Sequence, residues 1–567
     1  MKGNNIAIII LAFIAGMSSL IYEVSWIRPL QYLLGSTTYS ISIIFSCFML
    51  GLALGSLIFS KFLYRLKKNA EVFIFSQIIL AVYCVLMPSI FNLLPSIYSL
   101  SLPLYNYFWV FNALIFFSVF LSIALPCIIM GTVWPILVEM HQEKSISLKT
   151  GIIYASYNAG GIVGALVTGM ILIPLIGVKW TIFCAASLTL ASSFIVILLS
   201  AKKLGALIPL GIFTLLIISS FSSFDIKTLY EQGIYRKALS ENPIYSSEML
   251  FHADGRYATV DVIEEAGVVR SLLINGKGQG GTSMTDKRVN YLLAYLGILL
   301  GDNPSNALLI GLGTGTTAGH LGKHVKTEVI EIEPKITETV GYFSEVNRDV
   351  LNNKNVNIVY DDGRSYLANS KEKFDIIIPE PSDPWQDFSS LLFSEEFFQL
   401  SAQHLTNEGL FIQWIPIYEL SAEDFRNFYK TFNSVFPNVI IFANVRAEER
   451  SGPYPTELIL VGSKSGINIV NAKKNFYLLD EESRKMLEDV MLHRTIQKRF
   501  EGEDAADRIA YLALFNSEQL VDYANNSRII TDDNLLLEFS AARNIYRNNR
   551  EEVMSDLRGF VNENKTN

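Results

Sequence analysis

Hydrophobic residues run on almost without interruption from the N-terminus to position 223 of this 567-residue chain. An α-helix needs about 20 apolar residues to cross the hydrocarbon core of a bilayer, and the long runs meet that length. The pattern therefore predicts an α-helical membrane domain of about seven spans in contact with the lipid bilayer. The expected spans lie near residues 5–25, 40–62, 72–93, 108–131, 151–177, 180–200 and 205–223.

Beyond residue 246 the pattern changes twice. Residues 247–275 alternate in places and contain the turn signals Ala-Asp-Gly and Glu-Ala-Gly, which predict a small β-unit. From residue 306, short apolar strands alternate with helices, an order typical of a parallel, doubly wound α/β sheet of the Rossmann type. The expected strands are 306–310, 328–332, 357–360, 375–378 and 409–414, and the expected helices are 334–347 and 394–404.

These patterns divide the chain into four expected regions. They are a transmembrane helical domain at 1–224, a linker with the β-unit at 225–304, a Rossmann-like domain at 305–468 and a helical C-terminal extension at 469–567. Residues 469–530 are charged and helical in pattern and carry no recognisable chemistry. We interpret them as a lid or a packing segment.

Charge follows the same division. Positions 1–223 hold 11 Lys and Arg and 4 Asp and Glu, whereas the rest of the chain holds 35 and 50. The net charge of −8 excludes a nucleic-acid-binding protein, which needs a basic surface. All four cysteines lie in the apolar part, so we expect no disulfide framework, thiolate metal site or catalytic cysteine in the soluble part.

Glycines and acids follow the predicted strands at their carboxyl ends, where parallel sheets bind ligands. The glycines after the first strand let a ligand approach the backbone closely. An acid follows about 20 residues after the first of these glycines, which is the spacing of a group that accepts the hydroxyls of a ribose. The candidate nucleoside-binding residues are Gly311, Gly313, Gly315, Glu331, Asp362 and Gly363.

The rim of this candidate site is acidic. No GxxxxGK[ST] sequence occurs, so a P-loop is excluded. Carboxylates repel phosphates and attract cations, which favours a sulfonium nucleoside plus a polyamine over NAD. Crowding also raises the pKa of one carboxyl and thereby provides a general base. The acids are Glu331, Glu333, Asp361, Asp362, Glu380 and Asp383.

Histidines add nothing to this chemistry. His320 and His324 share one side of a predicted helix, and we expect them at the surface. With no third ligand in view, the sequence predicts no metal site.

Residues 270–420 resemble the spermidine synthase (aminopropyltransferase) family. The resembling segments are LLINGKGQGG (272–281), NALLIGLGTGT (306–316), VIEIEPKI (329–336), YDDGRSYL (360–367), FDIIIPEPSDPW (374–385) and LFSEEFFQL (392–400). The whole layout is similar to bacterial membrane-fused spermidine synthase-like proteins. Their span motifs resemble LIYEVSWIRPL (20–30) and LPCIIMGTVWPIL (125–137).

The resemblance implies a transferase of polyamine biosynthesis. Such an enzyme moves an aminopropyl group from decarboxylated S-adenosylmethionine to an amine, without a metal, and releases 5′-methylthioadenosine. By position, the donor nucleoside is held by Gln279, Glu331, Asp362 and Gly363. The presumed base is Glu380, and the amine side is formed by Asp383, Trp385 and Tyr418. Dimers are common in the family, so a homodimer is an expectation.

Two departures from the family pattern bear on the substrates. Thr314 stands where the family has the aspartate that holds the donor's amino group, so intact S-adenosylmethionine remains an alternative donor. The family's tyrosine–glutamate–histidine motif is also missing from DKRVNYLLAYL (286–296). Asp286 and Tyr291 are the nearest polar substitutes for it, and they leave the identity of the acceptor amine open.

Three hypotheses follow. The first is a membrane-bound aminopropyltransferase-like enzyme. The second is an S-adenosylmethionine-dependent methyltransferase or lyase on the same sheet. The third is a polyamine transporter or sensor whose nucleoside-binding domain is not catalytic. The released product separates the first two, and a sensor is expected to keep binding when Glu380 is changed.

Two predictions disagree about the side of the membrane on which the soluble part lies. The basic loops at 61–68, 144–149 and 202–203 predict a cytoplasmic N-terminus, and seven spans would then put the soluble part outside. A nucleoside donor is cytosolic, so we expect a cytoplasmic catalytic domain. One boundary is then wrong: either 108–140, which holds two prolines, breaks into pieces, or 205–223 lies in the interface.

Glu23 is the one carboxylate near the end of a predicted span. Acids inside a membrane are functional by default, so Glu23 is a candidate substrate contact. The alternative is an interfacial anchor that it forms with Arg28.

Overall fold

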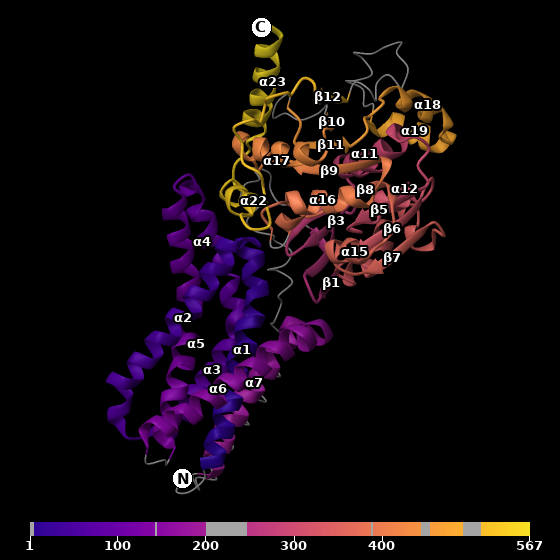
Figure 1. The fold of residues 1–567 in the computed structure, drawn as a ribbon. Helices are drawn as coiled ribbons and strands as arrows, with labels where there is room; N and C mark the ends of the chain where they lie inside the picture. The colour runs from indigo at the N-terminus through magenta and orange to yellow at the C-terminus, as the bar shows by residue number, and fades with distance from the viewer. Residues whose placement is uncertain are drawn as a thin grey trace. The chain divides into compact units, whose positions relative to one another are not determined.

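The computed structural model describes residues 5–141, 145–199, 247–386, 389–443, 454–491 and 512–566. The chain divides into two compact units (Figure 1). The helical unit comprises Met1–Pro243 with Ala253–Thr259 and Asn275–Lys277. The α/β unit comprises Ile244–His252, Val260–Ile274 and Gly278–Asn567.

Seven α-helices are described in the helical unit: α1 (Asn5–Leu34), α2 (Thr38–Lys61), α3 (Asn69–Phe91), α4 (Leu94–Ser101), α5 (Phe108–Met140), α6 (Ile146–Val167) and α7 (Ile173–Leu199). Helix α1 packs against α6 and α7, α2 against α5, and α3 against α7. The approach of α1 to α6 depends on glycine, because a Cβ at Gly16 would lie 1.9 Å from the carbonyl oxygen of Tyr157. Such close backbone packing is typical of helices in membranes.

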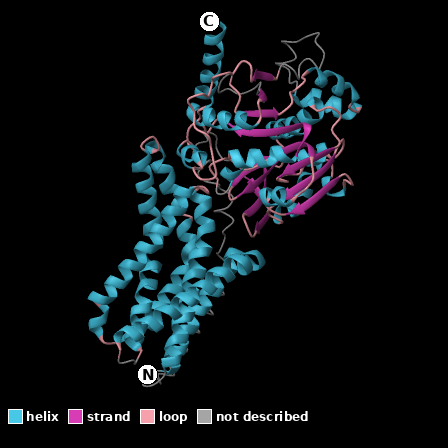
Figure 2. Ribbon diagram, in the orientation of Figure 1, coloured by secondary structure: helices cyan, strands magenta, loops and turns pink. Residues whose placement is uncertain are grey.

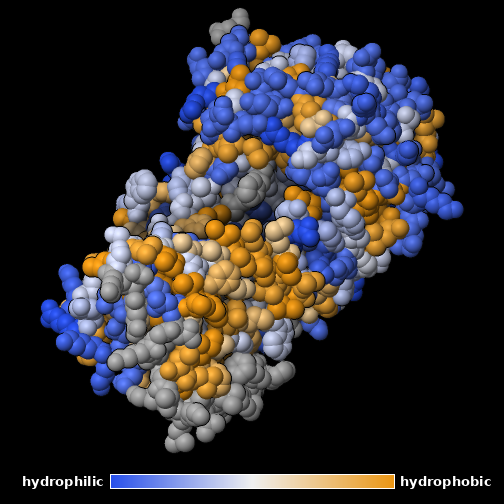
Figure 3. All heavy atoms as spheres, turned by 60° about the horizontal axis from the view of Figure 1, so that its bottom comes forward, coloured by the Kyte–Doolittle hydropathy of each residue, from blue (hydrophilic) through white to orange (hydrophobic). Residues whose placement is uncertain are grey.

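Five helical stretches of this unit are long and apolar enough to cross a membrane: Asn5–Leu34, Thr38–Leu66, Asn69–Met87, Phe108–Met140 and Ile146–Leu199. Hydrophobic side chains gather over the face of the helical unit, whereas the face of the α/β unit is largely hydrophilic (Figure 3). Among the exposed residues are Trp109 at 76%, Leu121 at 73% and Leu175 at 76%. Exposure of such an apolar surface to water is unfavourable, whereas contact with lipid is not.

The expected seven spans are not confirmed. The predicted spans 151–177 and 180–200 fall within one 54-residue helical stretch, Ile146–Leu199, which includes a π-helical turn, η3 (Thr168–Leu172). This stretch breaks at Gly177, whose φ of 75° and ψ of 170° are not helical. The predicted span 205–223 lies outside the described residues.

The suggested break in 108–140 is wrong. Helix α5 continues from Phe108 to Met140 with Pro126 and Pro135 inside it. Proline is tolerated within helices of this type because neighbouring groups can satisfy the freed backbone carbonyls.

The predicted β-unit is a four-stranded sheet in the order β1–β2–β3–β4. Its strands are β1 (Ser247–Asp254), β2 (Thr259–Glu265), β3 (Val269–Ile274) and β4 (Lys277–Gly281). Strand β2 faces inward almost throughout, with Val260 and Val262 both fully buried.

The second sheet has eight strands in the order β12–β10–β11–β9–β8–β5–β6–β7. The strands of the α/β unit are coloured magenta in Figure 2. The five strands from β9 to β7 are parallel, and β10, β11 and β12 add an antiparallel edge. The strands are β5 (Asn306–Ile310), β6 (Lys326–Glu331), β7 (Val356–Tyr360), β8 (Phe374–Pro379), β9 (Leu405–Pro416), β10 (Asn438–Ala443), β11 (Glu457–Ser463) and β12 (Ala513–Asn516).

The strand order is that of a doubly wound sheet. From β5 the chain adds β6 and β7 on one side and then returns to add β8 and β9 on the other. The order therefore reverses between β5 and β8, and ligands of such sheets bind where it reverses. Strand β12 lies within residues 469–530, so the prediction that this stretch is helical is wrong there. Its partner β10 lies far earlier in the chain, a pairing that no local pattern encodes.

The helices of this unit are α11 (Met284–Leu300), α12 (Thr316–Leu321), α13 (Lys335–Thr339), α14 (Ser344–Asn347), α15 (Gly363–Asn369), α16 (Glu395–His404), α17 (Ala422–Val435), α18 (Val470–Leu478), α19 (Glu481–Met491), α22 (Leu536–Ser540) and α23 (Arg550–Thr566). The predicted helix 334–347 is a series of short turns that includes α13 and α14.

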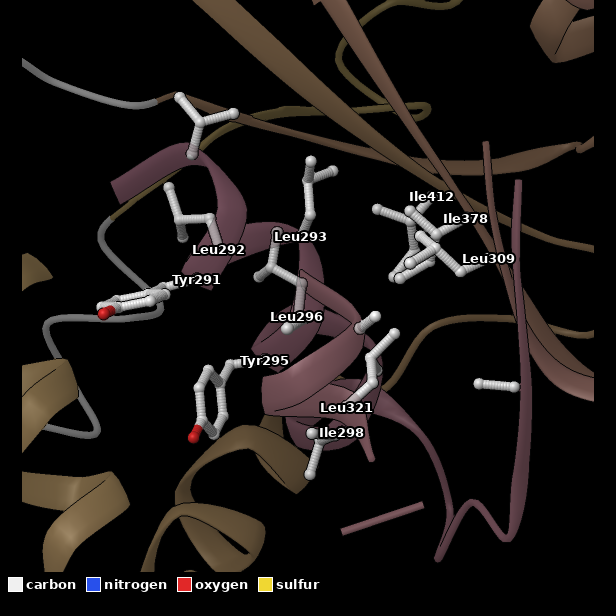
Figure 4. Close-up of a cluster of buried hydrophobic side chains, with 14 of the residues drawn as sticks. Tyr291, Leu292, Leu293, Tyr295, Leu296, Ile298, Leu309, Leu321, Ile378 and Ile412 are labelled. Carbon is white, nitrogen blue, oxygen red and sulfur yellow. The ribbon is translucent and has the colours of Figure 1, made fainter. Parts of the chain in front are cut away.

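The core of the α/β unit joins α11 to the sheet. Leu293 and Leu296 of α11 belong to one buried cluster with Leu309, Ile378 and Ile412 of β5, β8 and β9 (Figure 4). Full burial of one such side chain stabilises the fold by roughly 1.5–3 kcal/mol. This packing fixes α11 beside the point where the strand order reverses.

Candidate functional site

The glycine turn after β5 meets the end of β8 where the strand order reverses. The backbone N–H of Glu380 donates to the carbonyl of Ile310 over 2.8 Å. Gly311 has a φ of 103°, and a Cβ there would lie 2.9 Å from the carbonyl oxygen of Glu380. Only glycine satisfies both conditions, so Gly311 brings the turn and the acid together.

The rest of the glycine turn is held by a hydrogen bond from the side chain of Asn347. Gly313 and Gly315 have φ values of 52° and 78°, which carry the chain into α12. Asn347 donates its side-chain N–H to the carbonyl of Thr314 over 2.9 Å. The Thr314 hydroxyl lies 2.7 Å from that of Thr316, so the residue that departs from the family pattern is engaged within the turn.

Glu331 at the end of β6 is fixed against the same turn. One carboxylate oxygen accepts the backbone N–H of Leu312 over 2.8 Å, and the other accepts that of Glu333 over 2.8 Å. Burial raises the pKa of Glu331, and these two hydrogen bonds oppose the rise. A carboxylate oxygen has a second lone pair, so the fixed group can still accept hydrogen bonds from a ribose.

Asp362 and Gly363 lie at the end of β7. The Asp362 carboxylate accepts the backbone N–H of Ser365 over 2.8 Å and caps α15. A Cβ at Gly363 would lie 2.4 Å from Cγ2 of Ile310, so α15 approaches the end of β5 closely. The third predicted nucleoside segment therefore lies beside the glycine turn.

Gln279 on β4 supplies a donor without a partner. Its side-chain nitrogen is buried and makes no hydrogen bond within the described part of the chain. A Cβ at the next residue, Gly280, would lie 3.6 Å from Cγ2 of Thr314, which brings this end of β4 to the glycine turn. A buried N–H is costly to leave unpaired, so this position suits a ligand with acceptor atoms, such as a nucleoside.

Glu380 is the acid at the centre of the arrangement. Its carboxyl is partly buried, and the hydroxyl of Thr317 donates to it over 2.5 Å. Burial raises the pKa of Glu380 to about 7, against the opposing effect of that hydrogen bond. A carboxyl that titrates near neutrality can take up a proton during a reaction.

Sequence reasoning missed Thr317. It lies just beyond the resembling segment 306–316, and 63 residues separate it from Glu380. The sequence signal that could have found it is the pair of hydroxyl residues Thr316-Thr317 directly after the glycine turn. The turn that follows β5 lies beside the end of β8, where Glu380 is located.

The predicted amine side is buried and hydrogen-bonded. Asp383 is 1% exposed, and the Tyr418 hydroxyl donates to it over 3.4 Å. Trp385 is fully buried, and its indole N–H donates over 2.5 Å to Glu419, itself 2% exposed. The structure thus brings these predicted residues together and adds Glu419, a second buried carboxylate that the sequence did not single out.

Asp286 and Tyr291 lie on α11. Asp286 accepts the hydroxyl of Ser283 over 2.6 Å at the start of the helix. Tyr291 is 5% exposed, and its ring centroid lies 4.3 Å from that of His320. In Figure 4, Tyr291 points away from the sheet residues of the core. None of the contacts described for these two residues joins them to Glu380.

The expectation that His320 is a surface residue is wrong. It is 1% exposed, because α14 covers it and the carbonyl of Val346 lies 3.1 Å from its Nε2. Burial lowers the pKa of His320 to about 3, so it is neutral. Within the described ranges, no group of three or more His, Cys, Asp or Glu side chains could hold a metal ion.

Comparison with known proteins shows which family this chain is similar to. Residues 287–447 match the model of the spermine/spermidine synthase domain. A polyamine aminopropyltransferase of Thermococcus onnurineus is 28% identical over 199 residues, which are 35% of this chain and 70% of that protein. A spermidine synthase structure from Thermotoga maritima covers 47% of this chain and 84% of its own, with 21% identity and a TM-score of 0.36.

A longer relative reaches beyond the α/β unit. Polyamine aminopropyltransferase 2 of Aquifex aeolicus is 24% identical over 413 residues, which are 70% of this chain and 77% of that protein. This alignment is longer than residues 247–567 and so includes part of the helical unit.

Proposed function

Because this chain belongs to the spermidine synthase family of transferases, we propose that it is a membrane-bound enzyme that transfers an aminopropyl group to a small amine. The donor is decarboxylated S-adenosylmethionine, and the nucleoside product is 5′-methylthioadenosine. The observation that carries the proposal is Glu380, a carboxyl with a pKa of about 7 beside the glycine turn where the strand order reverses.

The reaction is a single displacement. The lone pair of the acceptor nitrogen attacks the carbon next to the sulfonium, a C–N bond forms, and the C–S bond breaks. Its electrons go to sulfur, which becomes a neutral thioether. The nitrogen gives up one proton, and Glu380 accepts it. A base with a pKa near the working pH is ionised often enough to do so.

The donor lies across the ends of β5, β6 and β7 in this proposal. Gln279 donates its unpartnered N–H to the nucleoside, and Glu331 accepts the ribose hydroxyls. Asp362 and Gly363 flank the adenine. The threonine at 314 offers no charge to an ammonium group, so the donor's amino end depends on other carboxylates.

The acceptor amine binds on the side of Asp383, Trp385 and Tyr418, with Asp286 and Tyr291 as further contacts. Carboxylates and aromatic faces together suit a cationic chain. Asp383 and Glu419 are held by an aromatic hydroxyl and an indole N–H, which keeps two buried acids in place near the reacting end.

The helical unit anchors the enzyme in a membrane, and the catalytic part lies in the cytoplasm. Support comes from its five long apolar stretches and its hydrophobic face. The 54-residue stretch is about 80 Å long at 1.5 Å per residue, and the break at Gly177 leaves two pieces that each match a bilayer.

Product identification tests the function. The full chain in detergent is incubated with decarboxylated or intact S-adenosylmethionine, with and without a panel of di- and polyamines, and nucleosides are measured by mass spectrometry. We expect methylthioadenosine only when decarboxylated donor and an amine are both present. S-adenosylhomocysteine would establish a methyltransferase, and methylthioadenosine without amine a lyase.

Two variants sharpen this test. Glu380→Gln should abolish methylthioadenosine release, whereas Glu345→Gln, at an exposed position of the same unit, should leave it unchanged. Nucleoside binding without turnover in the wild-type chain would instead support a transporter or sensor.

A further inference from the structure

The helical unit holds a carboxylate deep within α1. Glu23 is 4% exposed and lies in the interior of this helix, which begins at Asn5 and ends at Leu34. At a rise of 1.5 Å per residue, Glu23 lies about 27 Å from the first residue of the helix and about 16 Å from the last. It is therefore well away from either end.

Within the described residues, no positively charged side chain pairs with the buried Glu23. Its Oε1 accepts no hydrogen bond within the described residues. Arg28 lies five positions after Glu23, whereas residues on the same face of a helix are three or four positions apart. Arg28 donates instead to the backbone carbonyl of Arg256 over 3.0 Å. The anchor formed by Glu23 and Arg28 that the sequence suggested is therefore absent from the described structure.

Other acids of this unit show the ordinary arrangement. Glu71 lies in the first turn of α3 with its side chain 41% exposed, 3.8 Å from Lys68. Glu139 is exposed near the end of α5. A carboxylate withdrawn from water without a partner costs several kcal/mol, and in membrane proteins such groups mark ligand or ion sites.

Two further buried polar atoms without partners lie near the same level of the bundle. Trp26, 1% exposed, is one turn beyond Glu23 on the same face of α1, and its indole nitrogen makes no hydrogen bond within the described residues. Thr168 is fully buried at the start of the π-helical turn, and its hydroxyl is likewise unpartnered there. Isolated π-turns within α-helices frequently occur at functional sites.

Helix packing brings Thr168 to α1. Gly160 faces Phe13, and Gly164 faces Met17, so α1 and α6 run parallel with a matched step of four positions. The next step brings Thr168 level with Ile21, within one turn of Glu23. Tyr157 of α6 and Cys127 of α5 also lie within electrostatic reach of Glu23.

Aromatic rings complete the surroundings. Tyr22 and Trp26 stack at a centroid distance of 5.7 Å, and both are buried on α1, one residue before and three residues after Glu23. A carboxylate, a hydroxyl oxygen and aromatic faces are the groups that recognise an ammonium, which has three donors and no acceptor.

We propose that Glu23 is the centre of a second amine site, which binds a primary ammonium group within the helical unit. The inference rests on the proposed function, because it takes the ligand to be the amine substrate or product of the transferase. The Glu23 carboxylate neutralises the ammonium, and the Thr168 hydroxyl accepts one of its hydrogens. The site gives the helical unit a task beyond anchoring.

Equilibrium binding of labelled spermidine to the full chain in detergent tests the site. The wild-type chain and Glu71→Gln, the matched control, should each bind two equivalents. Glu23→Gln should bind one, with the other weakened at least tenfold. Glu23→Asp retains the charge on a shorter stem and should bind two equivalents, the second more weakly.

Thermal unfolding separates binding from folding. Glu23→Gln removes a buried carboxyl, so its melting temperature without amine should equal or exceed that of the wild-type chain. Two unchanged equivalents in Glu23→Gln would overturn the proposal. So would equal loss of binding in Glu23→Gln and Glu71→Gln.

Turnover distinguishes failure of this inference from failure of the proposed function. At saturating soluble amine, the wild-type chain and the Glu71→Gln control should release methylthioadenosine at equal rates. Turnover in the wild-type chain, together with two unchanged binding equivalents in Glu23→Gln, would refute the Glu23 site and retain the transferase. No turnover in the wild-type chain, with binding that depends on Glu23, would refute the transferase and retain the site.

Discussion

The hydrogen bond from Thr317 to Glu380 gives the sharpest test of the proposed base. Thr317→Val removes the donor and keeps the shape of a side chain that is 1% exposed. The hydroxyl stabilises the ionised form of Glu380, whose pKa burial has already raised to about 7. Without this hydrogen bond, the pKa of Glu380 should rise further.

The size of the rise follows from the hydrogen-bond energy. A hydrogen bond to a charged group contributes roughly 1.5–3 kcal/mol, and one pKa unit corresponds to about 1.4 kcal/mol. The pKa of Glu380 should therefore move up by about 1–2 units. At pH 7 the ionised fraction then falls from about one half to between roughly one tenth and one hundredth, so kcat/KM should fall about 5- to 50-fold.

The assay is the pH profile of methylthioadenosine release. The wild-type profile should rise with pH through about 7, because the base must be ionised. In Thr317→Val the rise should move to higher pH, and activity at pH 9.5 should return to within a few-fold of wild type. Thr339→Val is the matched control, since Thr339 is also fully buried but donates to Ile336 within its own helix.

Two results would refute this reasoning. Identical profiles for wild type and Thr317→Val would mean that the hydrogen bond has no influence on the group that limits the rate. An equal loss at every pH would mean that Thr317 acts through packing and not through the charge of Glu380.

Three further predictions concern stability. Burial raises the pKa of Glu380 from 4.5 to about 7, so the contribution of the protonated carboxyl to stability is fully present below pH 4.5 and is lost as the pH rises through 7. In denaturant unfolding above pH 7, Glu380→Gln should therefore be more stable than wild type by up to roughly 3 kcal/mol. At pH 4 the variant should show no such gain. Gly311→Ala should lower the melting temperature by the equivalent of about 2 kcal/mol or more, because φ is 103° and Glu380 is too close, whereas Gly341→Ala, with open space around it, should not. Arg364 forms two hydrogen bonds to Asp532, so Arg364→Lys should lose about 1–3 kcal/mol in denaturant unfolding, and wild-type stability would show that this pairing is dispensable.

The local pattern determined the elements that carry the site. The predicted strands 306–310 and 375–378 match β5 and β8 to within a residue, because a short apolar run between turn residues specifies a buried strand without help from the rest of the chain. The glycine turn was also readable, since positive φ at Gly311, Gly313 and Gly315 is a requirement that glycine meets locally.

Tertiary structure alone decided which groups meet. Thr317 reaches Glu380 only because the strand order puts β8 beside β5, and β12 forms only because β10 offers an edge. The sequence pattern predicts a surface position for His320, yet α14 covers it.

The helical unit illustrates the same division. Hydropathy determined which stretches suit a bilayer, because that property sums over neighbouring residues. It did not reveal the backbone break at Gly177 or the isolation of Glu23 from Arg28, because both depend on the direction in which each residue points once the helices have packed. A side chain's partners are set by contacts between distant parts of the chain, and a one-dimensional pattern does not contain them.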